Sequence, residues 1–333
     1  MLYFRCFRRS ALPIASLLAL SACAGSIGAG SVDESTTQAS AAHAPSATFP
    51  NAALTGLRPV PHQIQRRAEG ARTYAKSANL IYVTNFSNST VTVYDANLNN
   101  PPVLATITTG VDQPLSDCMD GSGTLYVVNQ TDSIPEYAQG STSPSVTITT
   151  GLSTPTFCAV DASGNLWVTN LGAPNITEYP KGSTSPSTII TNGATSPLGI
   201  AFDHAGNMYV ANRSNVEVYP PGGTSPTTTI TDGLNDVIGI AVDASGTLYA
   251  ANYGGNTVTE YKSGQTSPYQ TITEGISEDA GVTVDKKYGL FVANYGDNTI
   301  TEFAKGKTKP TKKSISQGLV QPEGMAYSPP LLP

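Results

Sequence analysis

The chain has 333 residues, of which 13% are charged and 8% are aromatic, and its formal net charge is −6. The first 23 residues hold three of the 18 basic residues and none of the 24 acidic ones, so their removal would leave a net charge of −9. This balance argues against nucleic acid and anionic lipid surfaces as partners.

The N-terminus carries an export signal. Arg5, Arg8 and Arg9 precede an apolar stretch, residues 11–20, that is too short to span a bilayer. It ends in Leu20-Ser21-Ala22-Cys23, which resembles a bacterial lipobox. The resemblance implies that residues 1–23 are a signal peptide and that Cys23 becomes a lipidated N-terminus. The protein would then be anchored in the cell envelope, at the outer membrane of a Gram-negative cell. The alternative is an ordinary secretory signal in which Cys23 is incidental.

Residues 24–76 are rich in Ala, Ser, Gly and Thr and poor in large apolar side chains. Such a segment buries too little surface to offset the entropy lost on ordering. We therefore expect a flexible tether between the lipid anchor and the folded domain.

Residues 77–328 consist of a repeated unit. The unit contains a short apolar run that ends in asparagine, as in Tyr82-Val83-Thr84-Asn85, and successive asparagines are 40 to 44 residues apart. The six asparagines are Asn85, Asn129, Asn170, Asn212, Asn252 and Asn294. A self-similar unit of about 40 residues indicates stacked modules, each too small to bury its own apolar face.

One repeat, residues 239–277, shows four strand-like segments. The first is a short apolar run that ends at a turn containing Asp243 and Gly246, and the third alternates β-branched or aromatic with polar residues. The four segments are Ile240–Val242, Leu248–Ala251, Thr257–Tyr261 and Tyr269–Thr273. Four antiparallel strands of this length form one blade of a β-propeller.

The two ends of the repeat region indicate how the ring closes. Residues 322–328 match the first strand of a repeat and are followed only by a short tail, residues 329–333. The first repeat lacks a good first strand of its own. We therefore predict an all-β, six-bladed propeller of four-stranded antiparallel blades, closed by the C-terminal strand in blade one. In the alternative closure, residues 71–76 supply that strand.

These repeats resemble known families over the whole folded part. Residues 82–85 with residues 90–95 look like the bacterial and archaeal YVTN repeat, and residues 239–243 with residues 248–252 are similar to the NHL repeat. The resemblance implies a propeller that serves as a scaffold, a ligand binder or occasionally an enzyme.

The sequence offers little catalytic machinery. Only His204 lies in the repeat region, at a turn, so a nucleophile there has no histidine base, and no phosphate loop or cysteine-pair metal motif occurs. We predict no cofactor and no catalysis.

A metal-dependent hydrolase remains the alternative. In the propeller lactonases, which this fold resembles, metal ligands lie in Pro-Glu-Gly contexts, and Pro322-Glu323-Gly324 matches that pattern. The corresponding positions of the other blades, by our alignment, carry no carboxylate: Leu198, Ile238, Ala280, Ser116 and Thr156. One carboxylate does not hold a divalent cation, so no metal is predicted, with Glu323 the ligand if any. A different acidic arrangement stays open, because four further carboxylates lie near the same rim: Asp117, Asp236, Glu278 and Asp279.

One face of the disc is the candidate binding surface. The six asparagines suit a structural role, since a short amide at a strand end bonds nearby backbone. The residues that follow them vary while their surroundings repeat, which is typical of a loop surface that diversifies on a fixed scaffold. These residues are Phe86, Gln130, Leu171, Arg213, Tyr253 and Tyr295. With Asp117, Asp236, Glu278 and Glu323 they form the predicted ligand-binding set.

Cys118 and Cys158 lie on the first strands of adjacent blades, two and three residues before the turn aspartates. Their side chains therefore have opposite parity, and an exported protein can form a disulfide between them. The alternative is two small buried residues, because Cα atoms more than about 7 Å apart cannot be bridged.

We predict a monomeric, lipid-anchored binding module whose partner, beyond the membrane reached through Cys23, is a glycan or a protein. Besides the hydrolase, a purely structural surface component fits the outer strands, which are rich in Thr and Ser.

Overall fold

The computed structural model describes residues 79–329, which form 24 strands between Leu80 and Ser328. This part of the chain contains no helix long and apolar enough to cross a membrane. The predicted signal peptide, Cys23, the tether, residues 71–76 and residues 330–333 lie outside the described residues.

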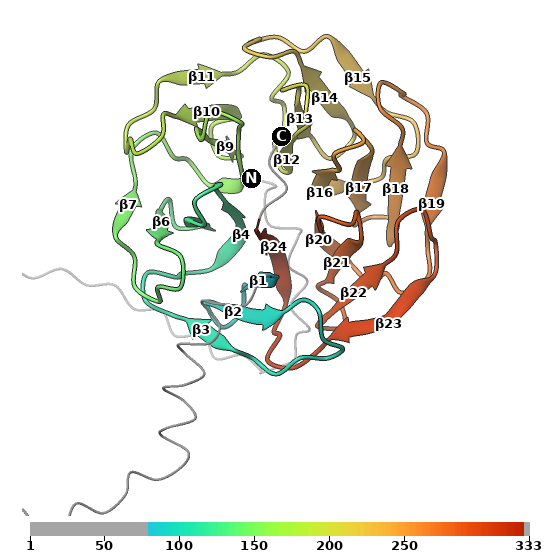
Figure 1. Ribbon diagram of the computed structural model, residues 1–333. Coiled ribbons are helices and arrows are strands. Elements are labelled where there is room, and N and C mark those ends of the chain that lie inside the picture. The colour runs from blue at the N-terminus through green and yellow to red at the C-terminus, as the bar shows by residue number, and fades with distance from the viewer. Residues whose placement is uncertain (1–78, 330–333) are drawn as a thin grey trace, which may run out of the picture. The chain divides into compact units, whose positions relative to one another are not determined.

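The strands form six four-stranded sheets arranged around a central channel, seen end-on in Figure 1. The inner strands are β24 (Pro322–Ser328), β4 (Pro114–Met119), β8 (Pro155–Val160), β12 (Ile200–Phe202), β16 (Val237–Val242) and β20 (Asp279–Val284). The second strands are β1 (Leu80–Asn85), β5 (Leu125–Asn129), β9 (Leu166–Asn170), β13 (Met208–Ala211), β17 (Leu248–Asn252) and β21 (Leu290–Asn294). The third strands are β2 (Thr90–Asp95), β6 (Ile134–Tyr137), β10 (Asn175–Tyr179), β14 (Val216–Tyr219), β18 (Thr257–Tyr261) and β22 (Thr299–Phe303). The outer strands are β3 (Ala105–Ile107), β7 (Val146–Ile148), β11 (Thr188–Ile190), β15 (Thr228–Ile230), β19 (Gln270–Ile272) and β23 (Pro310–Ile315). We number the blades 1 to 6 in this order, beginning with the sheet β24-β1-β2-β3.

The C-terminal strand closes the ring. β24 pairs antiparallel with β1, from Leu80 opposite Ser328 to Asn85 opposite Pro322. Because β1 has β24 on one side and β2 on the other, no edge of β1 is left for residues 71–76. The predicted six-bladed propeller and its closure by the C-terminal strand are confirmed.

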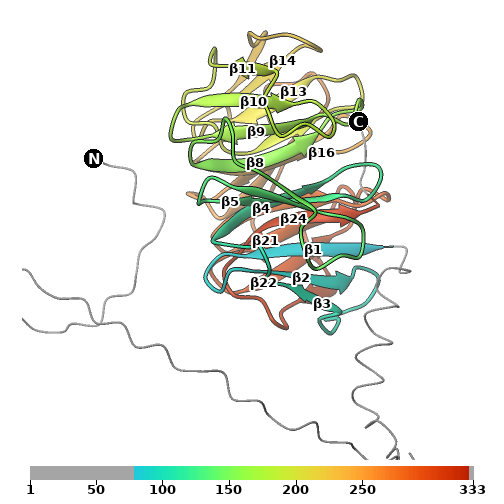
Figure 2. The same cartoon turned by 90° about the vertical axis from the view of Figure 1, so that its left-hand side faces the viewer.

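The second strands are apolar on both faces because each blade packs against two neighbours. Ile81 and Val83 of blade 1, for example, share one apolar cluster with Phe291 and Ala293 of blade 6. In the side view of Figure 2, β8–β10 of blade 3 lie next to β4 and β5 of blade 2. Burial on both faces explains why these strands read as continuous apolar runs rather than as alternating ones.

The six repeat asparagines are structural, as predicted. In blades 2 to 6 the side-chain oxygen of the asparagine accepts a hydrogen bond from the backbone N–H of the residue 17 positions earlier, at 3.0 Å in each case. In blade 1 the oxygen of Asn85 accepts the N–H of Val320, 2.9 Å away and near the other end of the chain. All six side chains are buried. Each asparagine therefore fixes the loop that leads into the inner strand of its own blade.

Candidate functional site

The second strands all end at or next to their asparagines on one face of the propeller, which we call the asparagine face. The residues that follow the asparagines are half-buried there: Phe86, Gln130, Leu171, Arg213, Tyr253 and Tyr295. Several of their backbone amides bond to the loop before the inner strand, as in Phe86 N–H to the Gln321 carbonyl (3.1 Å) and Tyr295 N–H to the Glu278 carbonyl (3.2 Å). The backbone of this face is thus fixed by repeated hydrogen bonds while its side chains differ from blade to blade.

Two of the predicted binding residues pair with each other. The Arg213 guanidinium lies 2.6 Å from an Asp236 carboxylate oxygen, with both side chains about one-third exposed. The pair joins blade 4 to blade 5, where the Arg213 carbonyl also accepts the Val237 N–H at 2.7 Å. Glu278 is exposed at the next junction. The structure therefore places Asp236 and Glu278 at the rim but does not bring them together with Asp117 or Glu323 into one acidic site.

Asp117 and Glu323 are buried, and so is Asp279. The carboxylates of Asp117 and Asp279 make no hydrogen bond of normal geometry with other described residues. Burial raises the pKa of Asp117 well above its usual value, and the backbone amides near it offset this only in part. Burial likewise raises the pKa of Asp279 and of Glu323 to about 8. Asp279 and Glu323 are therefore largely protonated near neutral pH.

The geometry provides no ligand set for the hydrolase alternative. Within residues 79–329, no three His, Cys, Asp or Glu side chains gather closely enough to hold a metal ion. The strand pairing also corrects our sequence alignment. Pro114 and Pro322 each lie opposite a repeat asparagine, so Leu115 and not Ser116 is the counterpart of Glu323. Leu115 lies 14 residues before Asn129, the same spacing that separates the counterparts in blades 3 to 6 from their asparagines, so the alignment had shifted blade 2 by one residue.

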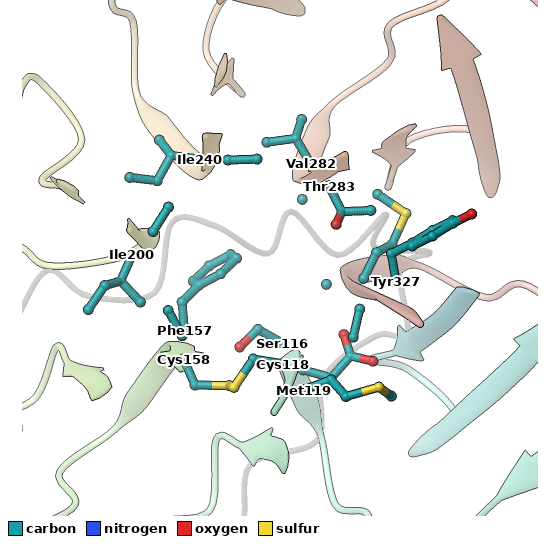
Figure 3. A pocket seen from close by; sticks show the side chains of 18 of the residues that line it. Ser116, Cys118, Met119, Phe157, Cys158, Ile200, Ile240, Val282, Thr283 and Tyr327 are labelled. Carbon is teal, nitrogen blue, oxygen red and sulfur yellow. A yellow bond between two sulfur atoms is a disulfide. The ribbon is translucent and has the colours of Figure 1, made fainter. Parts of the chain in front are cut away.

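The central channel is narrow and mostly apolar. All six inner strands line a cavity of about 160 Å³, and Figure 3 shows the Phe157 ring projecting into it. Ser116 and Asp117 are among the few polar residues of the wall, and the Ser116 hydroxyl also lacks a partner among the described residues. Small-molecule sites usually enclose about 300 to 1,000 Å³, so this cavity suits water better than a substrate.

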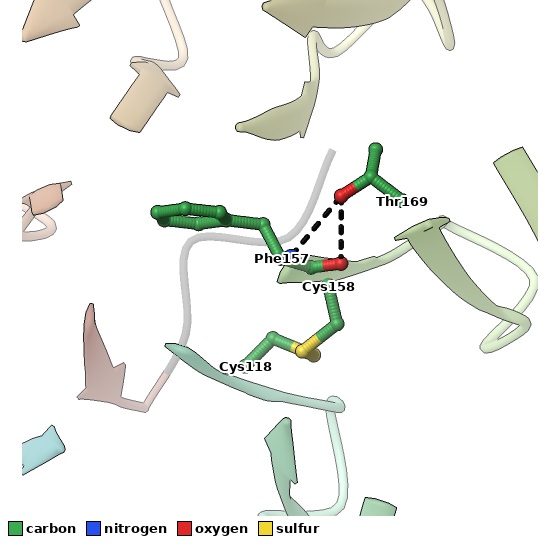
Figure 4. Close-up of a disulfide and its surroundings, with 4 residues drawn as sticks. All are labelled: Cys118, Phe157, Cys158 and Thr169. Carbon is green, nitrogen blue, oxygen red and sulfur yellow. Dashed lines mark hydrogen bonds between the residues drawn. A yellow bond between two sulfur atoms is a disulfide. The ribbon is translucent and has the colours of Figure 1, made fainter. Parts of the chain in front are cut away.

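Cys118 and Cys158 form a disulfide in the channel wall, with Cα atoms 5.8 Å apart (Figure 4). The bond joins the inner strands of blades 2 and 3. His204 is exposed at its turn, away from the asparagine face.

Comparison with known proteins supports the fold alone. No protein-family model and no curated protein sequence matches the chain. Solved structures do match. A protein of unknown function from Bacteroides caccae superimposes with a TM-score of 0.62 at 11% identity, over 75% of this chain and 99% of that one. A chain of a nidogen/laminin complex superimposes with a TM-score of 0.63 at 18% identity, over 75% of this chain and 98% of that one. At such identities the likeness extends to the propeller architecture and not to a site.

Sequence reasoning placed Asp279 near the rim but left it out of the candidate set. The structure buries it completely at the start of β20, opposite Asn294. The sequence does not predict this burial. Glu278 and Asp279 are adjacent at the start of a strand, where one side chain can face solvent while the next faces the core.

Proposed function

We propose that this chain is an exported β-propeller of the NHL or YVTN type, lipid-anchored through Cys23, that binds a partner on its asparagine face without catalysis. One observation carries the proposal. Six loops on one face hold different half-buried side chains, among them Phe86, Tyr253 and Tyr295, on a backbone fixed by the same asparagine bonds. A rigid scaffold with a varied aromatic and polar surface suits recognition.

Two further points support a binding module. A propeller of similar fold occurs in a nidogen/laminin complex, so this architecture is compatible with assembly between proteins. Glu323, the one residue that matches the lactonase pattern, is also held mainly in its neutral form, since burial raises its pKa to about 8. A neutral carboxyl group is a poor ligand for a metal ion.

Photo-crosslinking in the producing cell tests the binding face. A benzophenone amino acid at Tyr253 or Tyr295 should give an adduct of the same partner, protein or glycan, while the same group at Gln265, an exposed loop residue at the opposite end of β18, should not. Adducts from Gln265 alone, or no adduct from either tyrosine position, would exclude this face.

The lipid anchor has its own test. The wild-type protein should incorporate radiolabelled palmitate and sediment with the envelope membranes, and Cys23→Ser should abolish both. A wild type that takes up no label would exclude the anchor while leaving the binding face untouched.

A further inference from the structure

A hollow lies between blades 3 and 4, on the face opposite the asparagine face. Trp167 is the second residue of β9, which ends at Asn170, so its side chain lies at the far end of that strand. The hollow has a volume of about 310 Å³, within the range of about 300 to 1,000 Å³ that is usual for small-molecule sites and larger than the central channel cavity. Its wall includes Trp167, Phe202, Asp161, Glu178, Ser163 and Thr188.

Trp167 departs from the repeat in both identity and exposure. It is the chain's only tryptophan. The equivalent residues of the other blades are between 2% and 6% exposed, whereas Trp167 is half-buried. Those residues are Tyr82, Tyr126, Tyr209, Tyr249 and Phe291. This second-strand aromatic is therefore left open in blade 3 alone.

The neighbouring blade borders the hollow with compact residues. The loop of blade 4 contributes Pro221, Gly222 and Gly223 to the wall. At the position of Pro221, blades 3 and 6 have the longer side chains of Lys181 and Lys305.

The aromatic wall is fixed without a ligand. The indole N–H of Trp167 donates to the Asp161 carboxylate at 3.0 Å, and the ring meets Phe202 edge-on with centroids 5.9 Å apart. Trp167 lines the hollow and is half-buried, so part of its indole is accessible there. A pre-positioned aromatic face loses little entropy when it binds.

The polar wall is also held in place. The two Glu178 carboxylate oxygens accept hydrogen bonds from the Asn165 amide at 3.2 Å and from the Ser187 hydroxyl at 3.0 Å, and each retains capacity for a further donor. None of the described side chains that line the hollow is basic. The site therefore disfavours an acidic ligand, and it offers carboxylate oxygens to hydroxyl donors beside an aromatic surface.

We propose that this hollow binds a hexopyranose unit of a neutral glycan. The C–H face of the sugar would lie against the Trp167 indole, and its hydroxyls would donate to Glu178, because the Asp161 carboxylate already accepts four hydrogen bonds. The site is independent of the asparagine face and would give the protein a second ligand.

Tryptophan emission reports directly on this site, because Trp167 is the only fluorophore of its kind. The purified mature chain is titrated with maltotriose, cellotriose and chitotriose. We expect a saturable emission change with at least one of them, at a dissociation constant on the order of 1 mM. The trisaccharide that binds distinguishes plain glucans from N-acetylated amino sugars.

Two variants keep the fluorophore and alter the site. Pro221→Lys gives this wall position the longer residue that blades 3 and 6 have at the equivalent place, and it should weaken binding by about tenfold. Glu178→Gln should weaken it by about fivefold. The double variant Tyr253→Ala/Tyr295→Ala should bind the sugar like wild type, which separates this site from the asparagine face. The proposal is overturned if no trisaccharide gives a saturable change up to about 20 mM. It is equally overturned if both site variants, unfolding at the wild-type midpoint, bind as wild type does.

Discussion

Replacing Glu323 with glutamine should make the propeller more stable at neutral and alkaline pH, by an amount that grows with pH. Burial raises the pKa of Glu323 from 4.5 to about 8 in the folded protein. An acid whose pKa is raised on folding contributes stability below its unfolded pKa and loses it as the pH rises through the folded value. At about 1.4 kcal/mol per tenfold change in acidity, the wild type loses about 3 kcal/mol by pH 7 and about 5 kcal/mol above pH 8. Glutamine has nearly the same shape and cannot ionise, so Glu323→Gln avoids this loss.

The assay is urea unfolding of wild type and Glu323→Gln at about pH 4.5, 7 and 9, with equal m-values required. The two proteins should differ least at the acidic end, and the variant should lead by several kcal/mol at the alkaline end. Glu278→Gln, which removes an exposed carboxylate at the neighbouring junction, controls for the change in net charge. A constant difference between wild type and Glu323→Gln across this range would show that water in the channel solvates the carboxylate, and the argument from burial would fail.

Three further predictions concern the fold. Asn252→Ala removes a buried amide that bonds two strands and a loop, and should lower the free energy of unfolding by about 2 to 3 kcal/mol in urea; an unchanged midpoint would refute the structural role. Cys118→Ala with Cys158→Ala should cost about 4 kcal/mol, given the 40-residue separation, and reductant should destabilise wild type but not the variant. Gly281→Ala should prevent the protein from accumulating in soluble form, because the new Cβ would overlap the Glu323 carbonyl oxygen; a soluble variant with a wild-type melting curve would contradict that packing.

The repeat made the architecture accessible from sequence because each blade uses the same residues for the same local purpose. Asp243 predicts a turn since its carboxylate accepts the backbone amides of Ser245 and Thr247, as the structure shows. Closure was equally accessible, because residues 322–328 read as a first strand without a second. Local hydrogen bonds and the hydrophobic pattern determine these features, and both depend on residues that are close together in the sequence.

The sites were less accessible because they depend on what a neighbouring blade contributes. Arg213 and Asp236 were both predicted to meet a ligand, yet they are 23 residues apart and bond to each other across a junction. Trp167 reads as one more second-strand aromatic, and its own position does not reveal that it lines a hollow together with Pro221 of the next blade. Each of these contacts joins two non-equivalent positions in different repeats. An alignment of the repeats compares equivalent positions only, so it does not predict such contacts.

The junctions between blades show how the ring tolerates these departures. At four junctions an inner-strand glycine lets the next strand approach closely: a Cβ at Gly199 or Gly239 would lie 2.5 Å from a carbonyl oxygen of the following blade, and Gly281 and Gly324 are as crowded by the next inner strand. Only glycine permits this approach, so the sequence repeats it in blades 4, 5, 6 and 1.

Blades 2 and 3 have Ser116 and Phe157 where the others have that glycine, and a different contact joins each of them to the next blade. The disulfide between Cys118 and Cys158 links blade 2 to blade 3. The Thr169 hydroxyl, 2.5 Å from the Leu198 carbonyl oxygen, links blade 3 to blade 4. A covalent bond and a buried hydrogen bond thus replace backbone packing where the glycine is lost. The same two blades carry Asp117 and Phe157 in the channel wall and the half-buried Trp167. These departures from the repeat therefore occur in the blades whose junctions lack the glycine.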